Sequence, residues 1–101
     1  MNAQNSSMAV TIVFPRPFQA FLDGGKEIRV EASSVKEALE AVAVRFPRLK
    51  KHLFGELGRL RGFLRVYVND EDVRNRGGEE TRLKENDVIR IVPSIIGGAR
   101  E

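Results

Sequence analysis

One apolar run near the end of the chain constrains the fold more than any other feature. Residues 88–92 read Val-Ile-Arg-Ile-Val, which places apolar side chains on both faces of a strand. We expect such a strand to be buried on both faces, and a strand of that kind belongs in the interior of a sheet rather than at its edge. The last strand of this chain is therefore expected at the centre of a sheet, with earlier strands on either side of it.

Two earlier segments alternate as strands do and should form a hairpin. Residues 8–14 (MAVTIVF) are rich in β-branched residues, and residues 26–31 (KEIRVE) alternate cleanly, with Ile28 and Val30 pointing inward. The connection between them, residues 15–25, closes on glycines that accept the positive φ of a turn. The chain is thus expected to open with a β-hairpin that has a wide loop.

A helix is predicted after the hairpin. Ser34 stands three residues before Glu37, the spacing of a capping box. Pro47 disfavours a helical conformation at the preceding residue and ends the segment there or close by. Apolar residues between these limits share one helical stripe: Val35, Ala38, Leu39, Val42 and Phe46. One amphipathic helix should therefore pack across a sheet.

The elements after the helix complete the fold class. We expect a basic stretch over residues 48–62, with a short helical turn near 49–53, and then a strand at 63–68. A turn at 69–72 should lead into a short extended piece at Val73. A polar loop at 74–81 and a turn at 84–87 should then lead into the last strand. This order predicts an α+β fold of the β-grasp (ubiquitin-like) type. Its sheet is mixed, with four to five strands, one main helix packed across it, and the last strand inserted beside the first.

The 101 residues, 42% of them hydrophobic, fit one domain with one core. We assign residues 8–93 to the β-grasp domain. Residues 1–7 are polar and precede a second methionine, so they are interpreted as a disordered leader or an upstream start. Residues 94–101 are predicted to be a flexible C-terminal tail that contains Gly-Gly and a three-residue extension.

Composition argues against a catalytic site within the chain. There is no cysteine, which excludes disulfides, a thiol nucleophile and thiolate ligands for zinc. His52 is the single histidine and has no carboxylate cluster near it in the sequence, so it is expected to be a surface residue rather than a catalytic group or a metal ligand. Asp70, Glu71 and Asp72 lack the fuller oxygen set of a calcium loop and should be a solvated turn. No apolar run is long enough for a membrane span or a signal peptide, which predicts a cytoplasmic protein.

The segment after the last strand carries the candidate chemistry. Pro93 has no amide hydrogen to donate and should take the chain out of the sheet into Ser-Ile-Ile-Gly-Gly, residues 94–98. Glycines near a chain end can simply be a frayed terminus. Gly97, however, suits a tail that threads into another protein's narrow active site, because a residue without Cβ lets enzyme groups approach the backbone closely. Ile95 and Ile96 would anchor such a tail in extended form.

Residues 63–98, and especially residues 66–74 (VYVNDEDVR) with Gly77-Gly78, carry a family resemblance. They resemble the C-terminal half of the ubiquitin-like sulfur carriers, the group that includes the small subunit of molybdopterin synthase and the thiamine-biosynthesis carrier. The likeness is strongest to the carriers of cysteine biosynthesis. Over residues 8–62 mainly the order of elements agrees.

The resemblance implies that Gly98 is a substrate end rather than a catalyst. An adenylating enzyme related to ubiquitin-activating enzymes would use ATP to turn the Gly98 carboxylate into an acyl-adenylate. A sulfur donor or sulfurtransferase would displace AMP to leave a thiocarboxylate. A sulfur-accepting synthase would then pass the sulfur into cysteine, thiamine or the molybdenum cofactor. The chain itself would bind no cofactor and no metal.

The chain departs from the family pattern at its end. Family carriers usually end on Gly-Gly, whereas this chain continues Ala99-Arg100-Glu101, so the Gly98 carboxyl group is part of the peptide bond to Ala99. We hypothesise that a protease, of the zinc metallopeptidase kind that processes ubiquitin-like proteins, cleaves between Gly98 and Ala99. Alternatively, the extension abolishes carrier function or is an artificial remnant.

Two other functions fit the same sequence. The chain would be a protein modifier if Gly98 were joined to lysines of other proteins. It would be an RNA-binding or protein-binding module if it worked through the basic residues 45–65. The formal net charge of +3 is too mild to decide. Phe54, Phe63 and Tyr67 form no evident stacking platform, which disfavours nucleic acid, and a basic face could equally dock onto an acidic activating enzyme.

Overall fold

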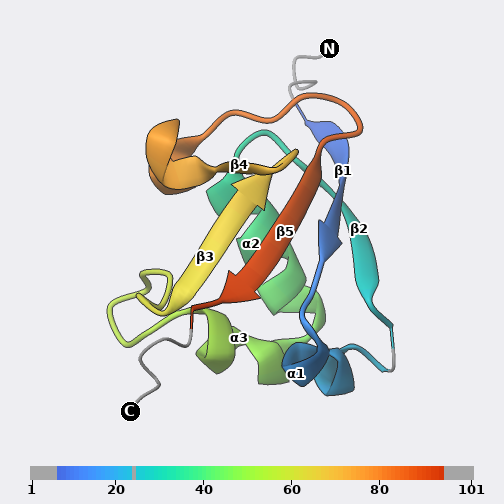
Figure 1. The fold of residues 1–101 in the computed structure, drawn as a ribbon. Helices are drawn as coiled ribbons and strands as arrows, with labels where there is room; N and C mark the ends of the chain where they lie inside the picture. The colour runs from blue at the N-terminus through green and yellow to red at the C-terminus, as the bar shows by residue number, and fades with distance from the viewer. Residues whose placement is uncertain (1–6, 24, 95–101) are drawn as a thin grey trace.

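The structure, a computed structural model, describes residues 7–23 and 25–94. A sheet forms one layer and the longest helix lies across one of its faces (Figure 1). The strands are β1 (Met8–Val13), β2 (Glu27–Ala32), β3 (Leu64–Val68), β4 (Glu71–Asp72) and β5 (Val88–Pro93). The helices are α1 (Arg16–Gln19), α2 (Val35–Arg45) and α3 (Pro47–Leu53), with 3-10 turns at Ala20–Leu22, Val73–Asn75 and Gly78–Glu80.

The strand order confirms the predicted β-grasp arrangement. The five-stranded sheet has the order β2-β1-β5-β3-β4. β1 is antiparallel to β2 and parallel to β5, with Ile12 opposite Ile89. β3 is antiparallel to both β4 and β5. The last strand therefore lies between the first strand and β3, as a mixed ubiquitin-like sheet requires.

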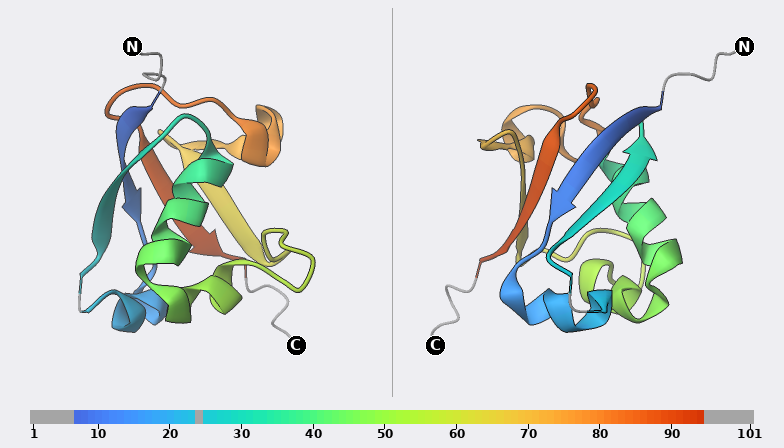
Figure 2. Two further views of the ribbon diagram at one scale, coloured as in Figure 1. Left: turned by 180° about the vertical axis from the view of Figure 1, so that it is seen from behind. Right: turned by 90° about the vertical axis from the view of Figure 1, so that its right-hand side faces the viewer.

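The core lies between the sheet and α2, and the other face of the sheet is open (Figure 2). Ile89 and Ile91 of β5 are buried against the helix, whereas Arg90 is exposed and Val92 is 36% exposed. The prediction that β5 is buried on both faces is therefore wrong. Its central position is right, but it follows from hydrogen bonding along both edges rather than from cover on both faces.

The predicted helix cap is confirmed with one change. The Ser34 hydroxyl accepts from the Glu37 amide at 3.2 Å. The Glu37 carboxylate accepts from the Ser33 amide at 3.0 Å and the Ser33 hydroxyl at 2.7 Å, one residue before the expected partner. These hydrogen bonds from Ser33 hold the pKa of Glu37 below its ordinary value. The predicted stripe is buried except for Phe46, which is half-buried.

The connection between β1 and β2 is more ordered than predicted. The expected wide loop contains α1 and the turn Ala20–Leu22, whose Phe18 and Leu22 are buried in the core. The segment is too short to show helical periodicity in the sequence. The helical turn expected near residues 49–53 is α3, with Pro47 at its first position, where a missing amide hydrogen has no helical partner to lose.

The short extended piece lies earlier than predicted. It is β4, whereas Val73, where it was expected, begins a 3-10 turn with its side chain buried. Asn69 and Asp70 join β3 to β4 with positive φ, as a two-residue hairpin turn requires. Within the described ranges, no helix is long and apolar enough to cross a membrane.

Candidate functional site

The predicted site residues lie beyond the part of the chain that the structure describes. They are the predicted adenylation site Gly98, the predicted threading residues Ile95, Ile96 and Gly97, and the predicted processing partner Ala99. The structure describes the base from which this segment continues, up to Ser94. The candidate site is therefore built from the end of β5 and its neighbours.

The chain stays attached to the sheet one residue longer than predicted. Pro93 is the last residue of β5 and lies opposite Leu64, so the prediction that the chain leaves the sheet at Pro93 is wrong. The Leu64 amide donates to the Arg61 carbonyl at 3.0 Å, and the Ser94 amide then donates to the Phe63 carbonyl. Pro93 thus occupies a non-hydrogen-bonded position of the antiparallel ladder, where a missing donor costs nothing.

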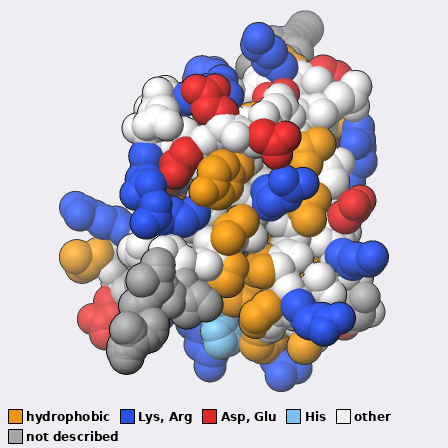
Figure 3. All heavy atoms as spheres, viewed as in Figure 1, with side chains coloured by type: hydrophobic (Ala, Val, Ile, Leu, Met, Phe, Trp, Pro, Cys, Tyr) orange, Lys and Arg blue, Asp and Glu red, His pale blue; other side chains and the backbone are white. Residues whose placement is uncertain are grey.

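The uncovered face of the sheet adjoins the end of β5, where the tail begins. Side chains alternate along strands, so residues flanking the buried Ile89 and Ile91 point to the open face. We call the exposed and half-exposed apolar residues there the apolar strip; they are Val13, Tyr67, Val88 and Val92. Figure 3 shows apolar side chains gathered on this face between Lys and Arg side chains. The strip was not predicted from the sequence, because β5 was expected to be buried on both faces.

The base of the tail is itself apolar. Phe63 is 50% exposed and Val92 is 36% exposed, and they flank the pairing of Pro93 with Leu64. Arg65, opposite Val92, adds a cation beside them. Exposed large apolar side chains next to each other mark a contact surface for another molecule. The strip and the base together form a face that a partner can hold while it receives the tail.

The other sequence signals have structural explanations. His52 is partly buried, with its ring stacked on Phe21 at a centroid distance of 4.5 Å, so it is less exposed than predicted. In the described ranges no group of three or more His, Asp or Glu could hold a metal ion. The acidic turn is neutralised by arginines, with Asp72 2.9 Å from Arg74, Asp70 3.0 Å from Arg90, and Glu71 3.7 Å from Arg76. Hydrogen bonds from Arg74 also hold the pKa of Asp72 below its ordinary value.

Comparison with known proteins gives the class. The chain matches the model of the ThiS family over residues 15–98. The sulfur carrier protein CysO of Mycobacterium tuberculosis is 28% identical over 93 residues, which is 90% of this chain and 100% of that protein.

Solved structures agree with this match. The chain is similar to a chain of the BexX/CysO complex of Amycolatopsis orientalis, with a TM-score of 0.80 and 37% identity, covering 89% of this chain and 100% of that one. Small archaeal modifier protein 1 of Methanosarcina acetivorans superposes with a TM-score of 0.82 at 24% identity, covering 91% of this chain and 98% of that one, which shows the shared fold alone.

The fold and these matches define a sulfur carrier with a ubiquitin-like body. The chain belongs to the ThiS family.

Proposed function

We propose that this sulfur carrier holds its sulfur as a thiocarboxylate on Gly98. The observation that best supports this proposal is the position of β5. The strand is hydrogen-bonded along both edges, and it places Ser94 at the edge of the domain beside an apolar surface. Gly98 follows four residues later, and four extended residues span at most about 14 Å. The family match also ends at residue 98, three residues before the end of the sequence.

The chemistry follows from the poor reactivity of a carboxylate. The Gly98 carboxylate is anionic and has no good leaving group, so an adenylating enzyme must first join it to AMP, releasing pyrophosphate from ATP. A donor at the sulfide oxidation level then attacks the acyl carbon through its sulfur and gives up its proton, and AMP leaves with the bonding electron pair. The thiocarboxylate sulfur next attacks the acceptor substrate held by a synthase, and hydrolysis of the acyl–sulfur bond returns the Gly98 carboxylate. In this scheme the chain is a co-substrate, and its partners supply all catalytic groups.

The body supplies recognition. The apolar strip and the base formed by Phe63 and Val92 would dock on the adenylating enzyme, with Arg65 at the edge adding charge attraction. A cysteine-forming synthase is the first acceptor to test, because residues 66–74 most resemble carriers of cysteine biosynthesis; thiamine and molybdenum-cofactor synthases are the alternatives. We expect these encounters in the cytoplasm.

The extension Ala99-Arg100-Glu101 has to be removed first, since activation needs a free carboxylate on Gly98. A metallopeptidase would hydrolyse the Gly98–Ala99 bond. Incubation of the full chain with cell extract, followed by intact-mass measurement, should show loss of these three residues. A chain that stays full length and is not adenylated by its activating enzyme with ATP contradicts the processing step.

The decisive experiment uses protein that ends at Gly98. With its adenylating enzyme, ATP and a sulfur donor, its mass should rise by the difference between sulfur and oxygen. Gly98→Val should block adenylation, because the added side chain obstructs the approach of enzyme groups to the carbonyl. It should leave the melting temperature unchanged, because residue 98 lies beyond the paired end of β5. A variant that unfolds, or one that is adenylated normally, would overturn the proposal.

The same experiment separates a carrier from a protein modifier. A modifier would give a ladder of larger species on denaturing immunoblots instead of the sulfur mass gain.

A further inference from the structure

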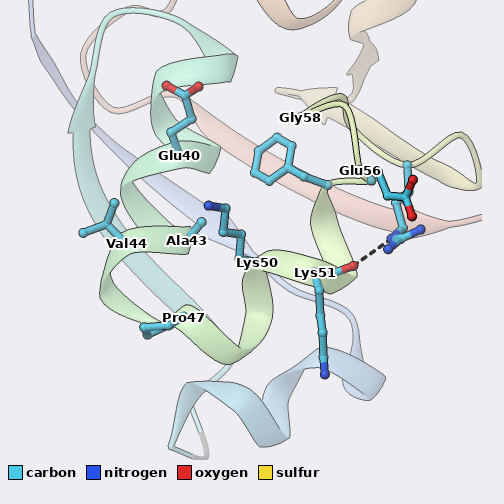
Figure 4. A pocket seen from close by; sticks show the side chains of 11 residues that line it. Glu40, Ala43, Val44, Pro47, Lys50, Lys51, Glu56 and Gly58 are labelled. Atoms are coloured by element: carbon cyan, nitrogen blue, oxygen red, sulfur yellow. Dashed lines mark hydrogen bonds between the residues drawn. The ribbon is translucent and has the colours of Figure 1, made fainter.

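The helix side of the molecule carries a groove that the proposed function does not use. It lies between α2, α3 and the connection that follows α3, and its volume is about 960 Å³. Figure 4 shows side chains from both helices around it, including Ala43, Val44 and Pro47. With Phe54 these residues give the groove an apolar lining. We call it the α2–α3 groove.

Exposed apolar side chains point to this groove as a contact site. Four large apolar residues are exposed in the described part of the chain, and two of them, Phe63 and Val92, belong to the base of the tail. The other two are Val44, 78% exposed, and Leu57, 84% exposed. Val44 lines the groove, and Leu57 lies in the sequence between two residues that line it, Glu56 and Gly58. Apolar side chains exposed at or near a hollow are typical of a contact site for another molecule.

The segment that forms most of the groove is basic, which favours an acidic partner. Residues 45–65 contain seven Lys or Arg and one Glu, whereas the whole chain is nearly balanced at +3. Lys50, Lys51 and Arg61 line the groove, and none of them forms an ion pair with another described residue. Arg61 is held in place because its Nε donates to the Lys51 carbonyl at 2.7 Å. Two acidic residues, Glu40 and Glu56, also line the groove, so cations outnumber anions.

A protein segment fits these features better than RNA does. Single-stranded RNA is bound by exposed aromatic faces on which bases stack. The single aromatic lining residue, Phe54, is only 7% exposed. An apolar side chain with neighbouring carboxylates would fill the apolar lining and pair with the unpaired cations.

We propose that the α2–α3 groove binds an acidic segment of a partner protein through an apolar anchor side chain. The two helices lie on the opposite side of the sheet from the apolar strip (Figure 2). A partner in the groove therefore leaves the apolar strip free. One protein can bind the groove while another binds the apolar strip.

The test uses two fluorescent peptides of equal length on the full chain. One is Glu-Glu-Leu-Phe-Glu-Glu, and the other replaces each Glu with Lys. The acidic peptide should bind at low salt and weaken as salt rises, because ionic attraction is screened. Its amide chemical-shift changes should centre on Ala43, Val44, Lys50 and Lys51, and the basic peptide should bind at least tenfold more weakly.

Charge-matched variants locate the site. The double variant Lys50→Glu, Lys51→Glu should weaken the acidic peptide at least fivefold. The control Lys36→Glu, Lys84→Glu makes the same charge change at exposed residues outside the groove and should have less effect. Val44→Gln should weaken binding without changing charge, and Gly98→Val should not affect it.

Several results would overturn the proposal. Shift changes centred on the apolar strip, or equal losses in the two double variants, would exclude the groove. A poly-uridine oligonucleotide that binds more tightly than the acidic peptide at the same residues would assign the surface to RNA. Shift changes at the groove that grow with protein concentration alone would assign it to a second copy of the chain.

Discussion

Glu37 ties the start of α2 to the ionisation of one carboxylate. Its side chain accepts two hydrogen bonds from Ser33, while its own amide donates to Ser34. Both bonds to Ser33 favour the charged form, so the pKa of Glu37 is lower in the folded chain than in the unfolded chain. The folded state is therefore stabilised when Glu37 is ionised.

We expect this contribution to depend on pH in one direction. It is fully present above the ordinary glutamate pKa of 4.5 and is lost as the pH falls through the lowered pKa of the folded state. Glu37→Gln keeps a hydrogen-bonding side chain at this position but removes the titration. The free energy of unfolding should be measured in urea from neutral to acidic pH for both proteins. The value for the original protein should exceed that of Glu37→Gln above pH 4.5, and the two values should become equal in acid. A constant difference across this range would contradict the assignment.

The connection between α3 and β3 links the helical layer to the base of the tail. The Arg61 amide donates to the Leu53 carbonyl at 2.8 Å, and the Arg61 side chain donates to the Lys51 carbonyl at 2.7 Å. Two residues later, the Phe63 carbonyl accepts from the Ser94 amide. Arg61 is thus a positioning residue that fixes the strand end against which the tail begins.

Arg61→Ala should loosen that base without unfolding the domain. Loss of one side-chain hydrogen bond costs about 1 kcal/mol, so the domain should stay folded. The Ser94 amide should exchange its hydrogen faster because its acceptor is less fixed. The apparent KM for the carrier in adenylation should rise more than kcat falls. Arg59→Ala is the matched control, since no hydrogen bond or ion pair of the Arg59 side chain is present in the described ranges. Equal exchange at Ser94 in both variants would exclude the positioning role.

Elements with a clear local signal were predictable from the sequence. Ser34 and Pro47 act on neighbouring backbone, so α2 and its limits could be inferred. Phe18 and Leu22 acquire their role only by packing under the core, so the short helical connection that contains them was missed. The Gly-Gly tail was visible as a motif, but the bond from Ser94 to Phe63 joins residues 31 positions apart and left no local signal.

At the scale of the whole molecule, the two faces of β5 have different roles: its inward side chains stabilise the core, and its outward side chains are available to contact a partner. Ile91 faces the core with 1% exposure, and the next residue, Val92, faces outward at 36%. A domain of this size is stable by only about 5–15 kcal/mol, so its core residues cannot be exchanged freely. The outward residues of the same strand are free of that constraint and can serve a partner.

Substitutions at these two adjacent positions should therefore have opposite effects. Ile91→Ala should lower the free energy of unfolding by about 2–5 kcal/mol, because it removes buried methyl groups and leaves a cavity. The fraction that remains folded should still be adenylated with an unchanged apparent KM. Val92→Glu should change stability by only about 0.5 kcal/mol and raise the apparent KM, because it places a charge in the apolar base of the tail. If Val92→Glu were adenylated as well as the original protein, the open face would not dock on the adenylating enzyme, and the tail alone would account for recognition.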